Sequence, residues 1–258
     1  MAGTMDQADL AARQFGDTAA NYLGSSVHAQ GTDLDRLEAL TRRLQAARAL
    51  DLGCGAGHVA FALARGGAAG VIAYDLSGLM LAVVEREAQA RGHSQIAICR
   101  GAAERLPFDD ASFELIVTRF SAHHWASVPT AVAEMVRVLR PGGTLVVIDV
   151  VAPEAALLDT TLQTIELLRD MSHVRNYRPS EWRSMLNLPQ LGEARSEQWK
   201  LPLEFDSWVQ RIATPARRVA ALRAVFDDLP AEAREYFSVS ADGSFLSDAM
   251  WIEAAKRI

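Results

Sequence analysis

Two carboxylates flank a glycine-rich turn in the first third of the chain. Asp51 lies in a predicted strand, 49–52, which runs directly into the turn GCGAG at 53–57. Asp75 comes 24 residues later, at the end of a second apolar run, 71–74. Glycines between a strand and a helix let the backbone approach a ligand closely and present N–H groups to it. The pattern predicts a nucleotide-type cofactor here, although a tight turn without a ligand would use the same glycines.

The two acids indicate which cofactor fits. A dinucleotide fingerprint would have a third glycine where this chain has His58, and a carboxylate at Asp51 would repel a pyrophosphate. S-adenosylmethionine has no phosphate, and its ammonium and sulfonium attract a carboxylate. Asp75 is placed to accept hydrogen bonds from both ribose hydroxyls. We therefore expect S-adenosylmethionine as the cofactor, with an NAD-dependent oxidoreductase as the disfavoured alternative.

The surrounding pattern alternates between short apolar runs and amphipathic stretches. Strands are predicted at 49–52, 71–74, 96–99, 113–117, 144–150 and 249–255, an extended segment at 195–203, and helices over 154–188 and 206–237. Ser77 and Ser127 are expected to cap helices, as is either Thr32 or Asp33. Such alternation predicts an α/β fold with a doubly wound, mostly parallel sheet. We expect one domain over 1–258, with N-terminal helices or a lid at 1–47, a cofactor-binding core at 48–151, and a helical cap with closing strands at 152–258.

Composition limits the partners. The formal net charge is −6, which argues against general affinity for nucleic acid. No apolar run approaches the roughly 18–20 residues that span a bilayer, and the N-terminus has no signal-like apolar stretch. Only two cysteines are present, Cys54 and Cys99, too few for a disulfide framework or a thiolate metal cluster. We expect a cytoplasmic protein with no membrane insertion and no metal; a homodimer is one assembly that the sequence allows.

Four runs carry a resemblance to a known family: LDLGCGAGHVAFALA from 50, AYDLSGLML from 73, GAAERLPFDDASFELIVTRFSAHHW from 101 and VLRPGGTLVVIDVVAPE from 138. Together they resemble the class I methyltransferases of the ubiquinone/menaquinone C-methyltransferase-like group, and within it a bacterial subgroup named after YcgJ. The similarity covers roughly residues 10–190. It implies a Rossmann-like methyltransferase sheet and transfer of a methyl group from S-adenosylmethionine to a small-molecule acceptor.

The resemblance also implies roles for individual residues. It places Gly53, Cys54 and Gly55 along the methionine arm and ribose, with Asp51 near that arm and Asp75 on the ribose. Leu76 and Met80 would lie against the adenine, and Ala102, Ala103 and Glu104 at its edge. Arg119 would lie beside the sulfur, and Tyr22 on the lid near the cofactor carboxylate. For Cys54 and Met80, simple packing is an almost equal alternative. His173, Arg175 and Tyr177 resemble a similarly placed stretch of the subgroup and are candidate substrate residues.

One position departs from the family pattern. The family usually has Gly-Asp-Ala after the third strand, where the Asp accepts from the adenine amino group, whereas this chain has Gly101-Ala102-Ala103. Ala102 provides no side-chain acceptor, so adenine recognition must use backbone groups, water and apolar contact. This change leaves room for a protein that binds the cofactor or its demethylated product without catalysis.

His123 and His124 follow the fourth predicted strand and are the candidate catalytic residues. In an open α/β sheet, ligands bind outside the carboxyl ends of the strands, and a neutral imidazole can accept a proton near pH 7. The alternative is that one histidine caps the next helix and the other packs beside Trp125. We expect His124 to be the base because its position matches the more usual histidine of the wider family. Asp149 ends the fifth strand without evident partner acids, so a capping or structural role is expected for it.

Overall fold

A seven-stranded mixed sheet forms the centre of the computed structural model, which describes residues 6–7, 9–14 and 31–258. Its strands are β1 (Arg48–Leu52), β2 (Gly70–Asp75), β3 (Ile96–Arg100), β4 (Phe113–Arg119), β5 (Leu139–Val151), β6 (Arg195–Leu203) and β7 (Phe245–Ala255). The order is β3-β2-β1-β4-β5-β7-β6. The first five strands are parallel, and β7 runs antiparallel to both β5 and β6. The strand order reverses between β1 and β4: β2 and β3 follow outward from β1 on one side, and β5 follows from β4 on the other. Open α/β sheets bind ligands at such a reversal point.

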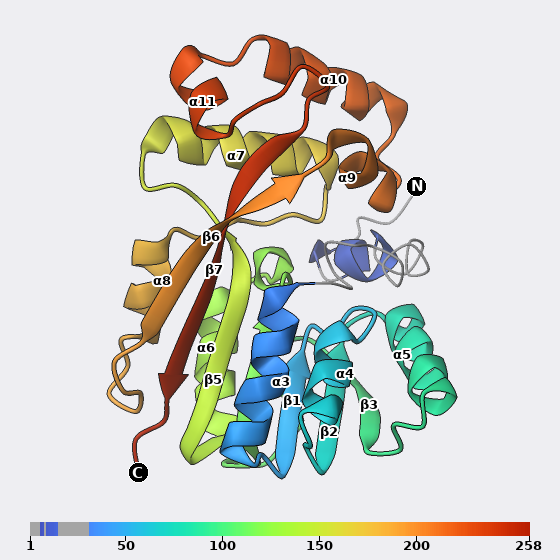
Figure 1. Ribbon diagram of the computed structural model, residues 1–258, viewed down its shortest axis with the longest axis vertical. Helices are drawn as coiled ribbons and strands as arrows, with labels where there is room; N and C mark the ends of the chain where they lie inside the picture. Colours follow the sequence, from blue (N-terminus) through green and yellow to red (C-terminus); the bar gives the residue numbers. More distant parts are fainter. Residues whose placement is uncertain (1–5, 8, 15–30) are drawn as a thin grey trace.

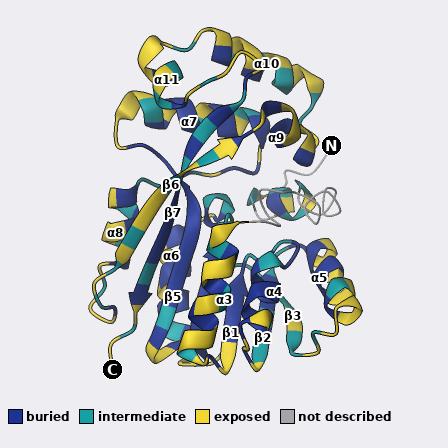
Figure 2. Cartoon of the chain, in the orientation of Figure 1, coloured by how far each residue is buried: buried dark blue, intermediate teal, exposed yellow. Residues whose placement is uncertain are grey.

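Alternate side chains of the strands supply two separate cores. In β1, Leu50 and Leu52 pack on one face and Ala49 on the other, because successive side chains of a strand point to opposite faces. One face is covered by α3 (Thr32–Leu44), α4 (His58–Arg65) and α5 (Gly78–Ala90), and the other by α6 (Val128–Val138) and α8 (Pro179–Leu186). Figure 2 shows the resulting burial of β1 and β5, while the outward faces of α3 and α5 are exposed. The strand β4 is buried in the same way.

A third core lies above the carboxyl ends of the strands. It is formed by α7 (Ala156–Arg169), α9 (Phe205–Arg211), α10 (Ala216–Asp227) and α11 (Ala231–Tyr236), together with the ends of β6 and β7. We call these four helices the cap; Figure 1 shows them over the sheet, with the helical residues 9–14 between cap and sheet. Gln14 donates from Nε2 to the carbonyl of Ile212 at 2.7 Å. The N-terminal segment is thus fastened to the cap, directly above the edge where a ligand would bind.

Local sequence signals located most elements correctly. All the predicted strands are present, and Ser77 and Ser127 cap α5 and α6 by accepting from the N–H groups of Met80 and Thr130. The α/β, mostly parallel fold class is confirmed. Within the described residues, no helix is both long and apolar enough to cross a bilayer.

Three expectations about helices were wrong. The stretch 154–188 is two helices, α7 and α8, separated by a loop at 170–178. The stretch 206–237 is three, because Pro215 and Pro230 each disfavour a helical conformation in the residue before them. Neither Thr32 nor Asp33 caps α3: the N-cap position is Gly31, which has no side chain to accept from the first turn.

Candidate active site

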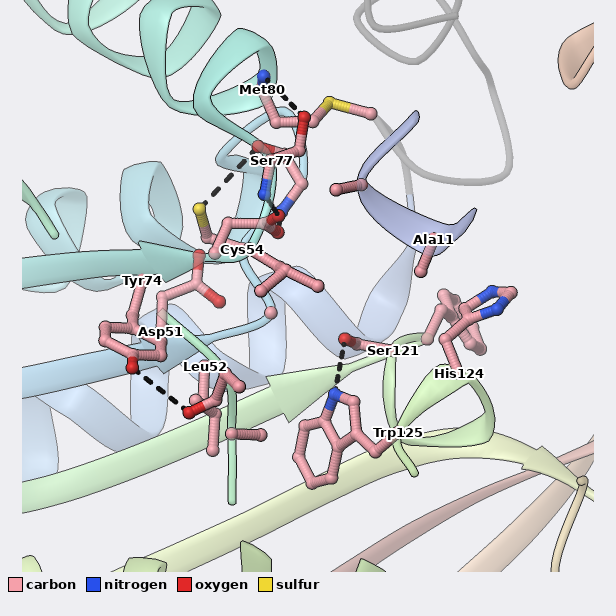
Figure 3. A pocket seen from close by; sticks show the side chains of 18 of the residues that line it. Ala11, Asp51, Leu52, Cys54, Tyr74, Ser77, Met80, Ser121, His124 and Trp125 are labelled. Atoms are coloured by element: carbon pink, nitrogen blue, oxygen red, sulfur yellow. Dashed lines mark hydrogen bonds between the residues drawn. The ribbon is translucent and has the colours of Figure 1, made fainter. Parts of the chain in front are cut away.

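A cavity opens at the carboxyl ends of β1, β2 and β4, at the reversal point of the sheet. It contains about 1090 Å³ of unoccupied space, which includes space open to solvent. The described residues predicted to bind the cofactor all line it, as does one histidine: Asp51, Gly53, Cys54, Gly55, Asp75, Leu76, Met80, Ala102, Ala103, Glu104, Arg119 and His124. Figure 3 shows several of these side chains around the cavity. Tyr22 lies outside the described residues.

The glycine turn approaches both the protein and the cavity closely. Gly53 has φ 72°, and a Cβ there would lie 1.9 Å from Oγ of Ser121, so a side chain at this position is excluded on steric grounds. Gly55 has φ 49°, and a Cβ there would meet no atom of the described residues within 4 Å. Since Gly55 lines the cavity, the space beside its backbone is available to a ligand.

Asp51 is a buried carboxylate with an incomplete set of partners. Its Oδ2 accepts from the N–H of Ala60 at 2.8 Å, whereas its buried Oδ1 has no hydrogen-bond partner among the described residues. Burial, helped by the charge of Asp75 and opposed by the Ala60 N–H, raises the pKa of Asp51 to about 8. Buried polar atoms normally have a hydrogen-bond partner. A positively charged or hydrogen-donating ligand in the cavity could supply one to Oδ1.

Asp75 connects the glycine turn to the start of α5. Its Oδ2 accepts from the N–H of Gly55 and its Oδ1 from the N–H of Ser77, each at 2.8 Å. Burial raises the pKa of Asp75, against these backbone hydrogen bonds. Each carboxylate oxygen retains a second lone pair, so Asp75 can hold the glycine turn and still accept from a ligand in the cavity.

The remaining predicted cofactor residues are fixed by contacts of their own. Met80 is buried in a small apolar cluster with Ala56, Val83 and Ile212 of the cap, and the carbonyl of Ala102 accepts from the hydroxyl of Tyr74 at 3.1 Å. Burial raises the pKa of the Cys54 thiol well above its ordinary range. Glu104 accepts from the N–H of Ser127 at 3.0 Å, so its carboxylate connects this part of the cavity wall to the start of α6.

Arg119 reaches the cavity already paired. Its Nε donates to Oδ2 of Asp33 at 2.5 Å, and the two side chains are only 5% and 10% exposed. The Asp33 side chain makes this contact with Arg119 and therefore does not cap α3. Phe120, the next residue, has φ 49°, which is uncommon for a bulky side chain; strained backbone of this kind is often found at functional sites.

The two neighbouring histidines lie in the 3-10 helix η1 (Ala122–His124) and have different surroundings. His124 lines the cavity, and its Nδ1 is 3.1 Å from the carbonyl oxygen of Ser172. His123 is not among the described cavity-lining residues; its Nδ1 is 2.6 Å from Oδ1 of Asp149. The two rings lie 4.2 Å apart between centroids.

The two imidazoles are also pushed toward opposite protonation states. Burial and the charge of His123 lower the pKa of His124 to about 4, outweighing Asp170. Burial acts to lower the pKa of His123 too, but the charge and hydrogen bond of Asp149 outweigh it and raise that pKa above its ordinary value. At neutral pH, His124 is therefore a neutral imidazole beside a histidine that is protonated more readily.

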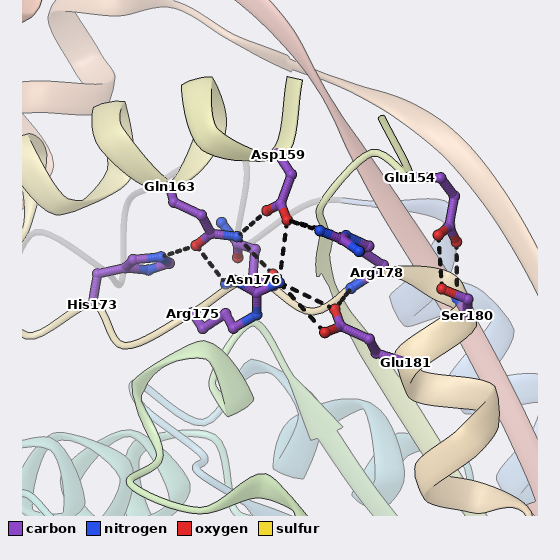
Figure 4. A network of polar contacts seen from close by, with 9 residues as sticks. All are labelled: Glu154, Asp159, Gln163, His173, Arg175, Asn176, Arg178, Ser180 and Glu181. Atoms are coloured by element: carbon purple, nitrogen blue, oxygen red, sulfur yellow. Dashed lines mark hydrogen bonds and ion pairs between the residues drawn. The ribbon is translucent and has the colours of Figure 1, made fainter. Parts of the chain in front are cut away.

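The three candidate substrate residues, His173, Arg175 and Tyr177, do not line this cavity. Figure 4 shows His173 and Arg175 in a polar network below α7. Nε2 of His173 is 3.1 Å from Oε1 of Gln163, and burial lowers the pKa of His173. Arg175 contacts Asp159 at 3.2 Å. Tyr177 packs edge-on against Trp182 at 6.0 Å between ring centroids.

Sequence reasoning missed the groups that hold the histidines. A capping or structural role was expected for Asp149, but its contact with His123 was not predicted. Its place at the carboxyl end of β5, beside β4 in the sheet, was the signal that could have indicated this. Ser172 and Gln7 contact the other histidine: Gln7 donates to the carbonyls of Ser172 at 2.6 Å and of His124 at 3.4 Å. No local pattern identifies these two residues.

The strand order and the cavity at the β1–β4 reversal define the class of Rossmann-like methyltransferase folds. The methyltransferase domain family matches residues 50–147. The chain is 46% identical over 186 residues to the uncharacterized protein YafE of Escherichia coli, covering 72% of this chain and 90% of YafE. It is 35% identical over 248 residues to the uncharacterized methyltransferase YcgJ of Bacillus subtilis, covering 94% and 98% of the two chains.

The fold of YcgJ agrees with this relationship. Its crystal structure superposes with a TM-score of 0.81, covering 87% of this chain and 99% of that one. A demethylmenaquinone methyltransferase of Bacillus subtilis is 36% identical over 112 residues, 43% of this chain and 48% of its own length. The chain belongs to the class I methyltransferases, in the family that contains YafE and YcgJ. The resemblance stated from the motifs is thereby confirmed, and membership of this family implies use of S-adenosylmethionine.

Proposed function

We propose that this methyltransferase transfers a methyl group from S-adenosylmethionine to a small-molecule acceptor. The observation that carries the proposal is Asp51, whose buried Oδ1 faces no partner among the described residues on the wall of a cavity at the β1–β4 reversal. An unpaired buried carboxylate is costly. A cationic ligand beside Asp51 would remove that cost, and S-adenosylmethionine carries two positive centres.

The other residues of the wall fit the rest of the cofactor. Each Asp75 oxygen accepts from one backbone N–H, of Gly55 or of Ser77, and retains a second lone pair. With these lone pairs Asp75 would accept hydrogen bonds from the ribose hydroxyls. The open space beside Gly55 would admit the ligand to the turn. Leu76 and Met80 would contact the adenine, and its edge would meet backbone groups at Ala102, since that residue has no side-chain acceptor.

His124 is the residue we assign to proton removal. When bound, the cofactor supplies a methyl group that is already activated by the positive sulfur, so the protein has to align the acceptor and take up any proton it loses. His124 lines the same cavity and, with a lowered pKa, is neutral at pH 7. It can therefore accept a proton from an oxygen, nitrogen or phenol-activated carbon acceptor.

Two alternatives make different predictions. A protein that binds the cofactor or its product without catalysis would retain the Asp51–Asp75 wall but would not need His124. An NAD-dependent oxidoreductase would have to bring a pyrophosphate to the turn beside Asp51, where charge repulsion opposes it. We therefore favour methyl transfer over both.

The test is transfer of labelled methyl from S-adenosylmethionine to a low-molecular-weight cell extract. We expect incorporation with the wild-type protein, and a loss of about 10²- to 10⁴-fold in His124→Ala, the usual range for general base catalysis. Calorimetry with S-adenosylhomocysteine should show nearly unchanged affinity in that variant. Tight binding without incorporation into any fraction would favour the binding protein, and absence of binding would refute the proposal.

A further inference from the structure

The loop at 170–178, between α7 and α8, contacts the proposed base directly. Ser172 is fully buried, and its carbonyl oxygen lies 3.1 Å from Nδ1 of His124. A carbonyl can only accept a hydrogen bond, so Nδ1 must carry the proton of the neutral ring. The basic lone pair of His124 is then on Nε2. The backbone of Ser172 thus determines which nitrogen of His124 can take up a proton.

Asp170 holds Ser172 in this position. Its Oδ1 accepts from the N–H of Ser172 at 2.8 Å and from the Ser172 hydroxyl at 2.6 Å. Asp170 is 1% exposed, and its Oδ2 has no hydrogen-bond partner among the described residues. The Ser172 Oγ is also 3.4 Å from Nδ1 of His124. A buried carboxylate, a serine and an imidazole are therefore connected in series.

The charges around His124 make the Asp170 carboxylate important. His123 and His173 place two further imidazoles beside it, with ring centroids at 4.2 and 6.3 Å. A positive charge on His124 is opposed by His123 and favoured by Asp170 and by Asp149 of β5. Asp170 also interacts electrostatically with His123 and with Glu166 and Arg169 of α7. Asp170 is thus the carboxylate on the loop side that offsets the charge His124 gains with a proton.

The rest of the loop is anchored firmly enough to hold this geometry (Figure 4). Oε1 of Gln163 lies 3.1 Å from Nε2 of His173 and accepts from the N–H of Asn176 at 3.0 Å. Further along, Arg178 donates to Oδ2 of Asp159 at 2.6 Å. These contacts fasten the segment that follows Ser172 to α7.

We propose that Asp170 and Ser172 are positioning residues that direct Nε2 of His124 toward the acceptor. This inference rests on the proposed function. As the acceptor atom bonds to the methyl carbon, the carbon–sulfur bond breaks with its electron pair remaining on sulfur, and the acceptor's proton passes to Nε2. Nδ1 keeps its proton on the Ser172 carbonyl, and Asp170 offsets the new charge. The acceptor class is therefore a nucleophile that must lose a proton.

The first measurement needs neither cofactor nor acceptor. Nitrogen NMR of the imidazoles at pH 7 should show the Nδ1–H tautomer for His124 in the wild type. Asp170→Asn and Ser172→Ala should each convert part of that population to the Nε2–H tautomer. The control is Asp248→Asn, which removes a carboxylate of β7 that accepts from the Tyr236 hydroxyl at 2.7 Å and pairs with Lys200 at 2.9 Å; it should leave the tautomer unchanged.

The second measurement is methyl transfer from labelled S-adenosylmethionine to the cell extract. Asp170→Asn and Ser172→Ala should lower kcat at least tenfold, with KM for S-adenosylmethionine within twofold of wild type and no effect of Asp248→Asn. An Nε2–H tautomer in the wild type, an unchanged tautomer in both variants, or wild-type kcat in both would overturn the inference. If the tautomers behave as expected but no fraction is ever methylated, the proposed function fails while the hold of Asp170 and Ser172 on His124 stands.

Discussion

Because Asp51 is buried and its pKa is raised, cofactor binding should depend on pH. Its pKa of about 8 means that roughly nine-tenths of the carboxyl groups carry a proton at pH 7. An opposite charge within about 4–6 Å lowers a carboxyl pKa by roughly 1–3 units, so an ammonium beside Asp51 would bring that pKa to about 5–7. Binding at pH 7 should then release about 0.4–0.9 proton.

The direction of the effect follows from this release. Because the free protein holds the proton more tightly than the complex does, affinity should rise with pH, by up to about tenfold per unit, and level off near pH 8. Calorimetry with S-adenosylhomocysteine, which retains the ammonium, in buffers of different ionisation enthalpy counts the protons directly. Asp51→Asn should bind at least tenfold more weakly at pH 8 and release no proton. Asp110→Asn, which removes a carboxylate whose side chain is 78% exposed, should behave as wild type.

The same carboxylate should cost stability before the cofactor binds. The folded pKa of Asp51 is raised from 3.8 to about 8, so the folded state holds a proton that the unfolded chain loses above pH 4. Raising the pH therefore destabilises the protein, by on the order of 4 kcal/mol at pH 7. Asp51→Asn should melt at a higher temperature than wild type, by a margin that grows from pH 5 to pH 8. Two results would refute this account of Asp51. One is a wild-type binding enthalpy that does not depend on the buffer; the other is a difference in melting temperature between Asp51→Asn and wild type that shrinks as the pH rises.

Four further substitutions probe the other residues that line the cavity. Asp75→Ala should weaken S-adenosylmethionine binding at least tenfold, since hydrogen bonds to charged groups contribute about 1.5–3 kcal/mol each; calorimetry on a folded variant with unchanged affinity would remove the ribose assignment. Ala102→Asp should tighten S-adenosylmethionine more than an analogue lacking the adenine amino group, and equal effects would place Ala102 away from the adenine edge. Gly53→Ala should lower the melting temperature, because its Cβ would fall 1.9 Å from Ser121 Oγ. Gly55→Ala should lower the free energy of unfolding by only about 1–2 kcal/mol, because alanine is strained in a left-handed backbone conformation, and it should also reduce cofactor affinity. If Gly55→Ala lowers the melting temperature as much as Gly53→Ala does, the space beside Gly55 is not open.

Sequence patterns predicted what depends on neighbouring residues. Ser77 and Ser127 cap the helices that follow them because capping involves groups only three residues away. The end of α7 was missed, although its cause is equally local. Oδ1 of Asp170 accepts from the N–H of Ser172, and such a side-chain-to-backbone bond competes with continued helix. Pro179 then begins α8, as a proline fits the first helical position.

Contacts between distant segments could not be predicted in the same way. Asp33 had the composition and position of a helix cap, yet its side chain pairs with Arg119, 86 residues away. A buried guanidinium needs a carboxylate partner, and this requirement prevailed over a cap whose loss costs about 1 kcal/mol. The position of β7 between β5 and β6 is likewise set by packing of complete elements rather than by any local pattern.

The histidine pair shows the limit most clearly. The sequence placed both residues after β4, but which one faces the cavity depends on the turn that carries them. In a 3-10 helix, with three residues per turn, consecutive side chains project about 120° apart, so His124 can line the cavity while His123 meets Asp149. The carboxylates that distinguish the two come from other segments, Asp149 on β5 and Asp170 on the loop after α7. Two identical side chains therefore acquire opposite pKa shifts only after the sheet and the cap have assembled around them.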